Sequence, residues 1–127
     1  MEPQFKVGKD VDTSIFENKD KLILLVFTAT WCNPCKQLKK QLYDTSSNEG
    51  LVVDFKDKLH VIYIDADTEE NSELIECYEV TALPTQKLVK LEFDSVKNTA
   101  NVQVLHTLQG CDVPGLIHKI NESNVTV

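Results

Sequence analysis

Residues 22–36 read LILLVFTATWCNPCK, an apolar run followed directly by two cysteines three positions apart. The run that fills positions 22–28 is apolar almost throughout, which is typical of a strand buried on both faces of a sheet. Behind it, Pro34 suits the first turn of a helix, and apolar residues recur at helical spacing from Cys35 onward. This stretch therefore predicts a strand, a turn that carries both cysteines, and a helix over about 33–44.

The rest of the chain extends this start into an α/β sheet. A second apolar run, HVIYID at 60–65, predicts another buried strand, and the apolar positions within 51–59 share one helical face and continue the crossover. A strand, a helix and a second strand in this order form a right-handed parallel unit. Further on, alternating residues at 87–93 and 101–108 predict an antiparallel hairpin, which is joined by a long loop, DSVKNTA.

Two more helices complete the expected fold. The segment DTEENSELIECYEV at 67–80 opens with a capping sequence, and CDVPGLIHKI at 111–120 offers Asp112 as a cap before apolar residues at helical spacing. We therefore expect an α/β fold with a central mixed sheet flanked by helices. With 127 residues the chain is long enough for one core but short for two, so residues 1–127 are expected to form a single domain.

The composition argues against several classes of partner. The net charge of −7 is the opposite of what phosphate binding requires, and the densest basic stretch, KQLKK at 36–40, is interpreted as the solvated face of a helix. The longest apolar run covers only positions 22–27, too few to span a bilayer, and the N-terminal residues show no export pattern. We therefore expect a cytoplasmic protein that binds neither nucleic acid nor membranes.

The two cysteines of the opening stretch have the spacing of a redox pair. A three-residue offset at the start of a helix brings two sulfurs within bonding range. Unpaired backbone N–H groups and the helix dipole favour a thiolate on Cys32, while Cys35 points back toward the core. Cys32 can therefore attack a substrate disulfide, and Cys35 can resolve the mixed disulfide that results.

The alternative interpretations of this pair are a structural zinc half-site and two idle thiols. Zinc takes four ligands, and the other candidates, Cys77, Cys111 and three scattered histidines, contain no second close pair. We therefore expect no metal. Cys77 is interpreted as a small, inert hydrophobic residue of a short helix. Cys111 has two interpretations, an exposed cysteine without a role and an accessible thiol that forms mixed disulfides or links two chains into a dimer.

Three parts of the chain resemble the thioredoxin family. They are FTATWCNPCK at 27–36, YEVTALPT at 78–85, and Gly110 after the last expected strand. The resemblance implies the thioredoxin fold and an enzyme that reduces protein disulfides as a monomer and without a cofactor. Its electrons would come from a thioredoxin-reductase-like enzyme or another thiol donor.

The resemblance also implies roles for individual residues. It gives the two cysteines the roles of attacking and resolving thiol that their positions indicate. Pro84 would be a cis-proline that faces the disulfide, and the backbone of Leu83 would pair with an extended substrate strand. Trp31 and Gly110 would help to form the apolar surface around the sulfurs.

Two positions depart from the family pattern. The family usually has a buried acid six residues before the attacking cysteine, where this chain has Val26, and the lysine that partners the acid would fall near Val61. Without a carboxylate to take the proton of Cys35, we expect the resolving step to depend on water or to be slower. This loss leaves a competing hypothesis open, a thioredoxin-fold binding or assembly subunit whose CxxC pair is slow or vestigial.

Overall fold

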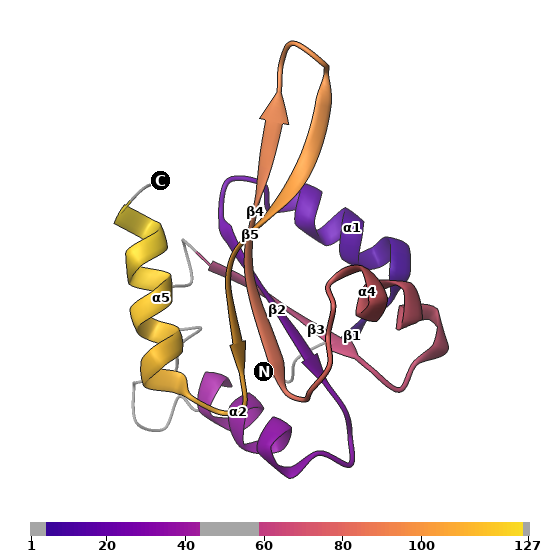
Figure 1. Cartoon of the computed structure of the whole chain (residues 1–127), viewed down its shortest axis with the longest axis vertical. Coiled ribbons are helices and arrows are strands. Elements are labelled where there is room, and N and C mark those ends of the chain that lie inside the picture. Colours follow the sequence, from indigo (N-terminus) through magenta and orange to yellow (C-terminus); the bar gives the residue numbers. More distant parts are fainter. Residues whose placement is uncertain (1–4, 44–58, 126–127) are drawn as a thin grey trace.

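The chain folds into a five-stranded mixed sheet with helices on both faces (Figure 1). The computed structural model describes residues 5–43 and 59–125. The strands are β1 (Phe5–Lys6), β2 (Leu22–Thr28), β3 (Leu59–Asp65), β4 (Thr85–Asp94) and β5 (Thr99–Gln109). The helices are α1 (Gly8–Glu17), α2 (Asn33–Tyr43), the 3₁₀ turn η1 (Glu69–Asn71), α4 (Ser72–Cys77) and α5 (Val113–Val125). No helix within the described ranges is long and apolar enough to cross a membrane.

The strands are arranged across the sheet in the order β1–β3–β2–β4–β5. β1 and β2 lie parallel to β3, whereas β4 runs antiparallel to β2 and β5 runs antiparallel to β4. The two long parallel strands end side by side, because Thr28 of β2 pairs with Asp65 of β3. The expected α/β fold with a central mixed sheet is therefore confirmed, and its parallel strands bring their carboxyl ends to one edge.

The apolar run of β2 is buried along its whole length because helices cover both faces of the sheet. On one face the core contains Leu24 of β2, Leu38 of α2 and Leu116 of α5. On the other face Ile23 of β2 packs with Ile15 of α1, and residues of α4 pack against them. Figure 1 shows α2 and α5 on one side of the sheet and α1 and α4 on the other.

The helices agree with most of the sequence-based expectations. Helix α2 occupies the expected range, and α5 has the expected cap, because the backbone N–H of Gly115 donates a hydrogen bond to Asp112 Oδ1 (3.1 Å). The short helix expected within 67–80 is present as η1 and α4, although no side chain caps either of them. The helical face expected over 51–59 lies outside the described residues, except that Leu59 belongs to β3.

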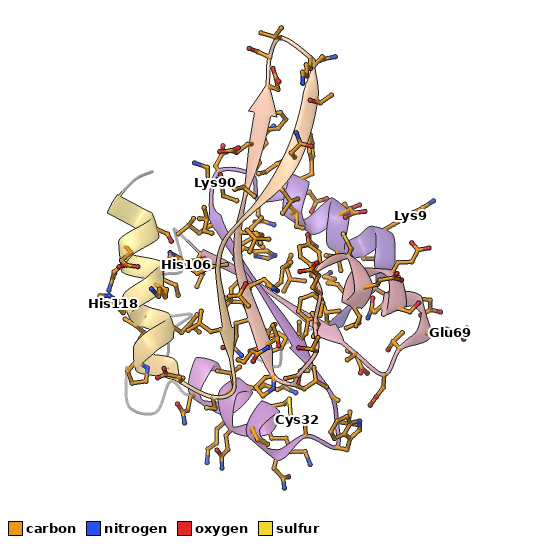
Figure 2. All side chains as sticks on the ribbon, in the orientation of Figure 1. Lys9, Cys32, Glu69, Lys90, His106 and His118 are labelled. Atoms are coloured by element: carbon orange, nitrogen blue, oxygen red, sulfur yellow. A yellow bond between two sulfur atoms is a disulfide. The ribbon has the colours of Figure 1, made fainter. Side chains whose placement is uncertain are left out.

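The hairpin of β4 and β5 differs from the expectation of a long loop. Its strands pair as far as Asp94 opposite Thr99, so that only 95–98 form the tip. The expectation is wrong because Asp94 Oδ1 accepts hydrogen bonds from the backbone N–H groups of Val96 (3.0 Å) and Lys97 (3.2 Å), which closes a tight turn. The hairpin projects from the sheet at the end of the molecule opposite the CxxC pair (Figures 1 and 2).

Candidate active site

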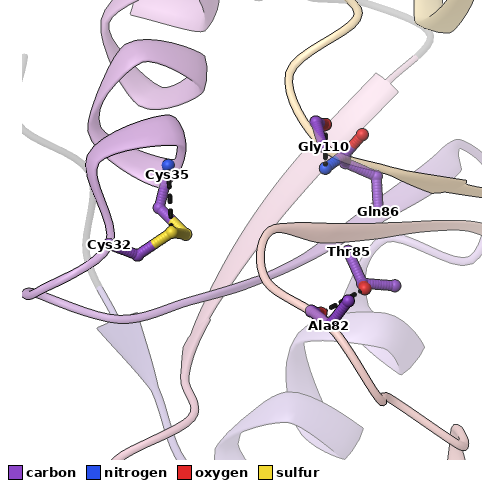
Figure 3. Close-up of a disulfide and its surroundings, with 6 residues drawn as sticks. All are labelled: Cys32, Cys35, Ala82, Thr85, Gln86 and Gly110. Atoms are coloured by element: carbon purple, nitrogen blue, oxygen red, sulfur yellow. Dashed lines mark hydrogen bonds between the residues drawn. A yellow bond between two sulfur atoms is a disulfide. The ribbon is translucent and has the colours of Figure 1, made fainter.

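The two cysteines of the CxxC pair lie at the amino end of α2 and are joined by a disulfide (Figure 3). Their Cα atoms are 5.2 Å apart, within the usual range for a bridged pair. Cys32 directly precedes the helix, and the backbone N–H of Cys35 donates a hydrogen bond to Cys32 Sγ (3.3 Å). The sulfur of Cys32 thus takes the place of a capping side chain, where backbone N–H groups and the helix dipole stabilise negative charge.

The sulfurs belong to a small apolar cluster. Cys32 is 4% exposed and Cys35 is 2% exposed, and both pack with Ala29. Leu83, from the loop before β4, packs against the same cluster. Trp31 is 66% exposed, so its ring is at the surface and available for the apolar role that the resemblance implies. The site therefore combines nearly buried sulfurs with an exposed aromatic side chain next to them in the sequence.

The loop before β4 is fixed to the residue that follows β5. The Leu83–Pro84 peptide bond is cis, as the resemblance implies. The backbone N–H of Gly110 donates a hydrogen bond to the Pro84 carbonyl (2.9 Å). Within the loop, Thr85 Oγ1 donates a hydrogen bond to the Ala82 carbonyl (2.6 Å; Figure 3). The structure therefore brings Pro84 and Gly110 together, while Leu83 reaches the cysteines.

Tyr78 is the first residue of the segment 78–85, and its ring packs against the sheet. Its ring lies 5.9 Å from the ring of Phe27 in β2, measured between centroids. Burial raises the pKa of Tyr78 to about 12, with smaller contributions from Cys77 and Asp12. The phenol is therefore neutral at neutral pH and serves as an apolar anchor rather than as an acid or base.

Gln86 was not predicted from the sequence, yet it is fully buried beside the loop. Its Nε2 donates a hydrogen bond to the Gly110 carbonyl (3.2 Å), whereas its Oε1 has no hydrogen-bond partner among the described residues. In the sheet it pairs with Val26. The signal that could have identified Gln86 is the alternation of side chains along the strand. Gln86 is two positions before Leu88, so both side chains are on the same buried face.

The position of the family's buried acid is apolar in the fold. Val26 is 1% exposed and belongs to the core that α2 covers. The residue beside Val26 on β3 is Tyr63, and Val61 lies two positions earlier, opposite Leu24. Neither of these β3 residues is charged, so β3 offers Val26 no cationic neighbour at either position.

The other cysteines lie apart from the CxxC pair. Cys77 is exposed at the end of α4, where it lines a surface pocket with residues of β4 and β5, so it does not fill the interior as a small hydrophobic residue would. Cys111 is half-buried and packs against the core beneath α5. Within residues 5–43 and 59–125, no group of three or more His, Cys, Asp or Glu side chains is arranged to hold a metal ion.

A profile of the family described as Thioredoxin matches residues 5–109. The chain belongs to the thioredoxin family. A thioredoxin of Geodia cydonium is 28% identical over 118 residues, which cover 93% of this chain and 94% of the relative. Thioredoxin-1 of Saccharomyces cerevisiae is 34% identical over 90 residues, which cover 71% of this chain and 77% of the relative.

Solved structures agree with this membership. The crystal structure of the germline-specific thioredoxin Deadhead from Drosophila melanogaster has a TM-score of 0.71 to this fold, with 28% sequence identity and coverage of 94% of this chain and 97% of that one. Family membership and a CxxC pair at disulfide distance make the protein a thiol–disulfide oxidoreductase with protein-disulfide reductase activity.

Proposed function

We propose that Cys32 is the nucleophile of this oxidoreductase and that Cys35 is the resolving thiol. The Cys32 thiolate attacks one sulfur of a substrate disulfide, forms a mixed disulfide and displaces the other substrate sulfur as a thiolate. Cys35 then loses its proton and attacks Cys32 Sγ, which closes the Cys32–Cys35 disulfide and releases the second substrate sulfur. The substrate gains two electrons, and the pair loses two.

The hydrogen bond from the Cys35 N–H to Cys32 Sγ is the observation that supports this order. It marks the Cys32 sulfur as the one that faces the positive end of α2, where a thiolate is favoured. Cys35 lies within the first turn and is covered by the apolar cluster, which suits a thiol that reacts only with its neighbour.

Trapping of mixed disulfides tests the two roles. In a background with Cys77→Ser and Cys111→Ser, the Cys35→Ser variant should accumulate adducts with a disulfide-containing protein, and Cys32→Ser should accumulate none. Adducts would be counted by non-reducing gel electrophoresis and mass spectrometry. Equal yields from the two variants would contradict the assigned order.

Four residues around the pair are proposed to bind the substrate, namely Trp31, Leu83, Pro84 and Gly110. Leu83 supports this, because it packs against the cysteines and its backbone N–H and C=O make no hydrogen bond among the described residues. An extended substrate strand can pair with these free groups. The exposed ring of Trp31 supplies apolar surface for the same substrate.

The cellular setting is also part of the proposal. We place the protein in the cytoplasm, as a monomer with a single domain over residues 1–127, reduced by a thioredoxin-reductase-like enzyme or another thiol donor. Cys77 and Cys111 are free thiols, which fits a reducing compartment. Linkage of two chains through Cys111 remains a secondary proposal, and sedimentation of oxidised wild type and Cys111→Ser would test it.

A binding or assembly subunit with a slow CxxC pair is the second candidate, and Val26 supports it. An apolar residue at the acid position removes the usual proton acceptor from the buried side of Cys35. Turnover of a generic protein disulfide with dithiothreitol separates the candidates. A rate above that of dithiothreitol alone supports the enzyme, and an equal rate supports the binding subunit.

A further inference from the structure

A pocket of about 180 Å³ opens beside Cys35, where β2, α2 and β3 meet. Its walls are formed by 28–30 at the end of β2, by Cys35, Lys36 and Lys39 of α2, and by Asp65 at the end of β3. Thr28 pairs with Asp65 across the two strands, and each lies two positions after a residue that packs against α2, so both side chains are on the α2 face of the sheet. The pocket therefore places a carboxylate from one element and the cysteine of another around the same space.

Asp65 is held in place by two hydrogen bonds. Its Oδ1 accepts one from the backbone N–H of Asp67 (2.9 Å), and its backbone carbonyl accepts one from Asn71 Nδ2 (2.9 Å). Asn71 is fully buried, so the end of the strand is anchored to the interior. Oδ2 of Asp65 has no hydrogen-bond partner among the described residues. The carboxylate can therefore accept a proton without any movement of the strand.

The resolving step needs such an acceptor, and this inference rests on the proposed resolving role of Cys35. The thiol must lose its proton before it attacks. Val26 occupies the family's acid position and offers no acceptor. We propose that Asp65 takes the proton of Cys35 through water in the pocket. A space of about 180 Å³ holds several water molecules, and although much of the lining is apolar, Thr28, Thr30 and Asp65 supply polar groups that can bind them.

The step is balanced without any further reactant. The S–H bond of Cys35 breaks, and its proton passes along the water to the carboxylate of Asp65. The thiolate forms a bond to Cys32 Sγ, and the electron pair of the breaking disulfide leaves on the substrate sulfur. The neutral carboxyl of Asp65 then returns the proton to the solvent or to the departing thiolate.

The charges around the pocket suit this transfer. The ionisable side chains that face it are Cys35, Lys36 and Lys39 from α2 and Asp65 from β3, and the segment 28–30 contributes none. Positive charge near a thiol lowers the cost of its ionisation, and Lys36 and Lys39 bring two lysines to this lining. Among the described residues of the lining Asp65 is the one carboxylate, so a single substitution there removes the proposed acceptor.

Stopped-flow reaction with 5,5′-dithiobis(2-nitrobenzoate) measures the step directly. The reduced protein, with Cys77→Ser and Cys111→Ser, is mixed with one equivalent of the reagent. Cys32 releases the first coloured thiolate, and Cys35 releases the second when it resolves the mixed disulfide. We expect Asp65→Asn to leave the first phase unchanged and to slow the second about 100-fold, the lower end of the range for general-base help.

The pH profile separates proton transfer from a structural effect. Between about pH 6 and about pH 8, the second phase of the parent protein should change little, because a carboxylate takes the proton. In Asp65→Asn hydroxide must take it, so the rate should rise about tenfold per pH unit. Asp65→Glu should keep the flat profile, and the matched control Asp67→Asn, which alters an exposed neighbouring carboxylate, should behave like the parent.

The result that overturns the inference is an Asp65→Asn variant with the parent's rate and pH profile in the second phase, or an Asp65→Glu variant with the steep profile. Cys35→Ser distinguishes this failure from failure of the proposed function. If Cys35→Ser loses the second phase while Asp65→Asn keeps it, Cys35 resolves and Asp65 plays no part. If Cys35→Ser keeps the second phase, the resolving role itself is wrong.

Discussion

The backbone angle at Gly110 determines which residues this position tolerates. Its φ is 80°, a region that L-residues rarely adopt, yet an added Cβ would meet nothing within 4 Å. We expect Gly110→Ala to lower the free energy of unfolding by about 1 kcal/mol through backbone conformation alone, as measured by urea denaturation. Gly110→Asn should cost less, because asparagine tolerates positive φ better. Equal losses from the two variants would point to a lost contact instead.

Val26→Asp tests whether position 26 can supply the missing base. The side chain is 1% exposed, and its neighbours across the sheet are Tyr63 and Gln86, neither of which is cationic. We expect an unpaired carboxylate there to lower the free energy of unfolding by about 3 kcal/mol at neutral pH. Added to Asp65→Asn, the same change should restore the rate of the resolving step. A double variant as slow as Asp65→Asn would show that an acid at this position does not reach Cys35.

The sequence identified residues that belong to a short motif, but it missed residues whose role depends on their position in the folded sheet. The sequence located the cysteine pair, the cis bond before Pro84 and the exposed Trp31, because each lies within a recognisable stretch. It gave no catalytic part to Asp65 and did not consider Gln86. The place of Asp65 depends on strands and a helix that only the fold brings together, so no local pattern marks it. Gln86 had a local signal, its alternation with Leu88, but it lay just outside the strand expected at 87–93.

At the scale of elements, an aromatic contact supports the β4–β5 hairpin where it leaves the sheet. Phe93 of β4 lies edge-on to Phe16 of α1, with ring centroids 6.3 Å apart. Lys19 Nζ lies 4.9 Å from the Phe16 centroid and 5.6 Å from the Phe93 centroid. Both rings are exposed, so the contact lies at the surface and joins the hairpin to a helix that is distant in the sequence.

We expect Phe93→Ala to lower the free energy of unfolding by about 1 kcal/mol, because it removes the ring pair and one cation–π contact. Amide hydrogen exchange in β4 and β5 should also become faster near the tip. Val96→Ala is the matched control, since Val96 is 93% exposed at the tip, and it should change neither quantity. Comparable effects from the two variants would contradict a supporting role for the aromatic contact.

The elements that the sequence predicted are those with a long or strongly periodic apolar pattern. The strand at 22–28 and the helix that follows it were expected with nearly their observed bounds. β1 and α1 were not expected, because β1 has only two residues and α1 buries a narrow stripe that includes Val11 and Ile15. Their position depends on pairing with β3 and on Asn71 Oδ1, which accepts a hydrogen bond from the backbone N–H of Gly8 (3.1 Å).

At the scale of the whole molecule, the parallel pair of strands explains where the chemistry lies. β2 and β3 end at the same edge, so the turn that carries the cysteines and the residue that ends β3 share a pocket. In sheets with parallel strands, sites commonly form at these carboxyl ends. The parallel pairing of these two strands was expected from the sequence, and with it this edge. The pocket itself could not, because its walls come from three segments that only the complete fold brings together.

His60 links the stability of the whole fold to pH. Burial lowers the pKa of His60 below its ordinary value of 6.5, and the charges of Lys21 and Lys6 lower it further, against a smaller opposing effect of Glu17. The folded state therefore favours the neutral imidazole. Above pH 6.5 this contribution to stability is complete, and it is lost as the pH falls below 6.5, because the unfolded chain binds the proton first.

His60→Gln should remove this loss. From about pH 7.5 to about pH 5.5, the free energy of unfolding in urea should fall more steeply for the parent protein than for His60→Gln, and carboxylates common to the two proteins cancel in the difference. His118→Gln is the control. The His118 side chain is 71% exposed, and its Nε2 lies 3.5 Å from Glu122 Oε1. Replacing it should therefore not lessen the fall in the free energy of unfolding between neutral and acid pH. If the parent and His60→Gln lost stability in parallel, the buried imidazole would not be the group that responds to pH, and the neighbouring positive charges would have no part in the acid sensitivity of the fold.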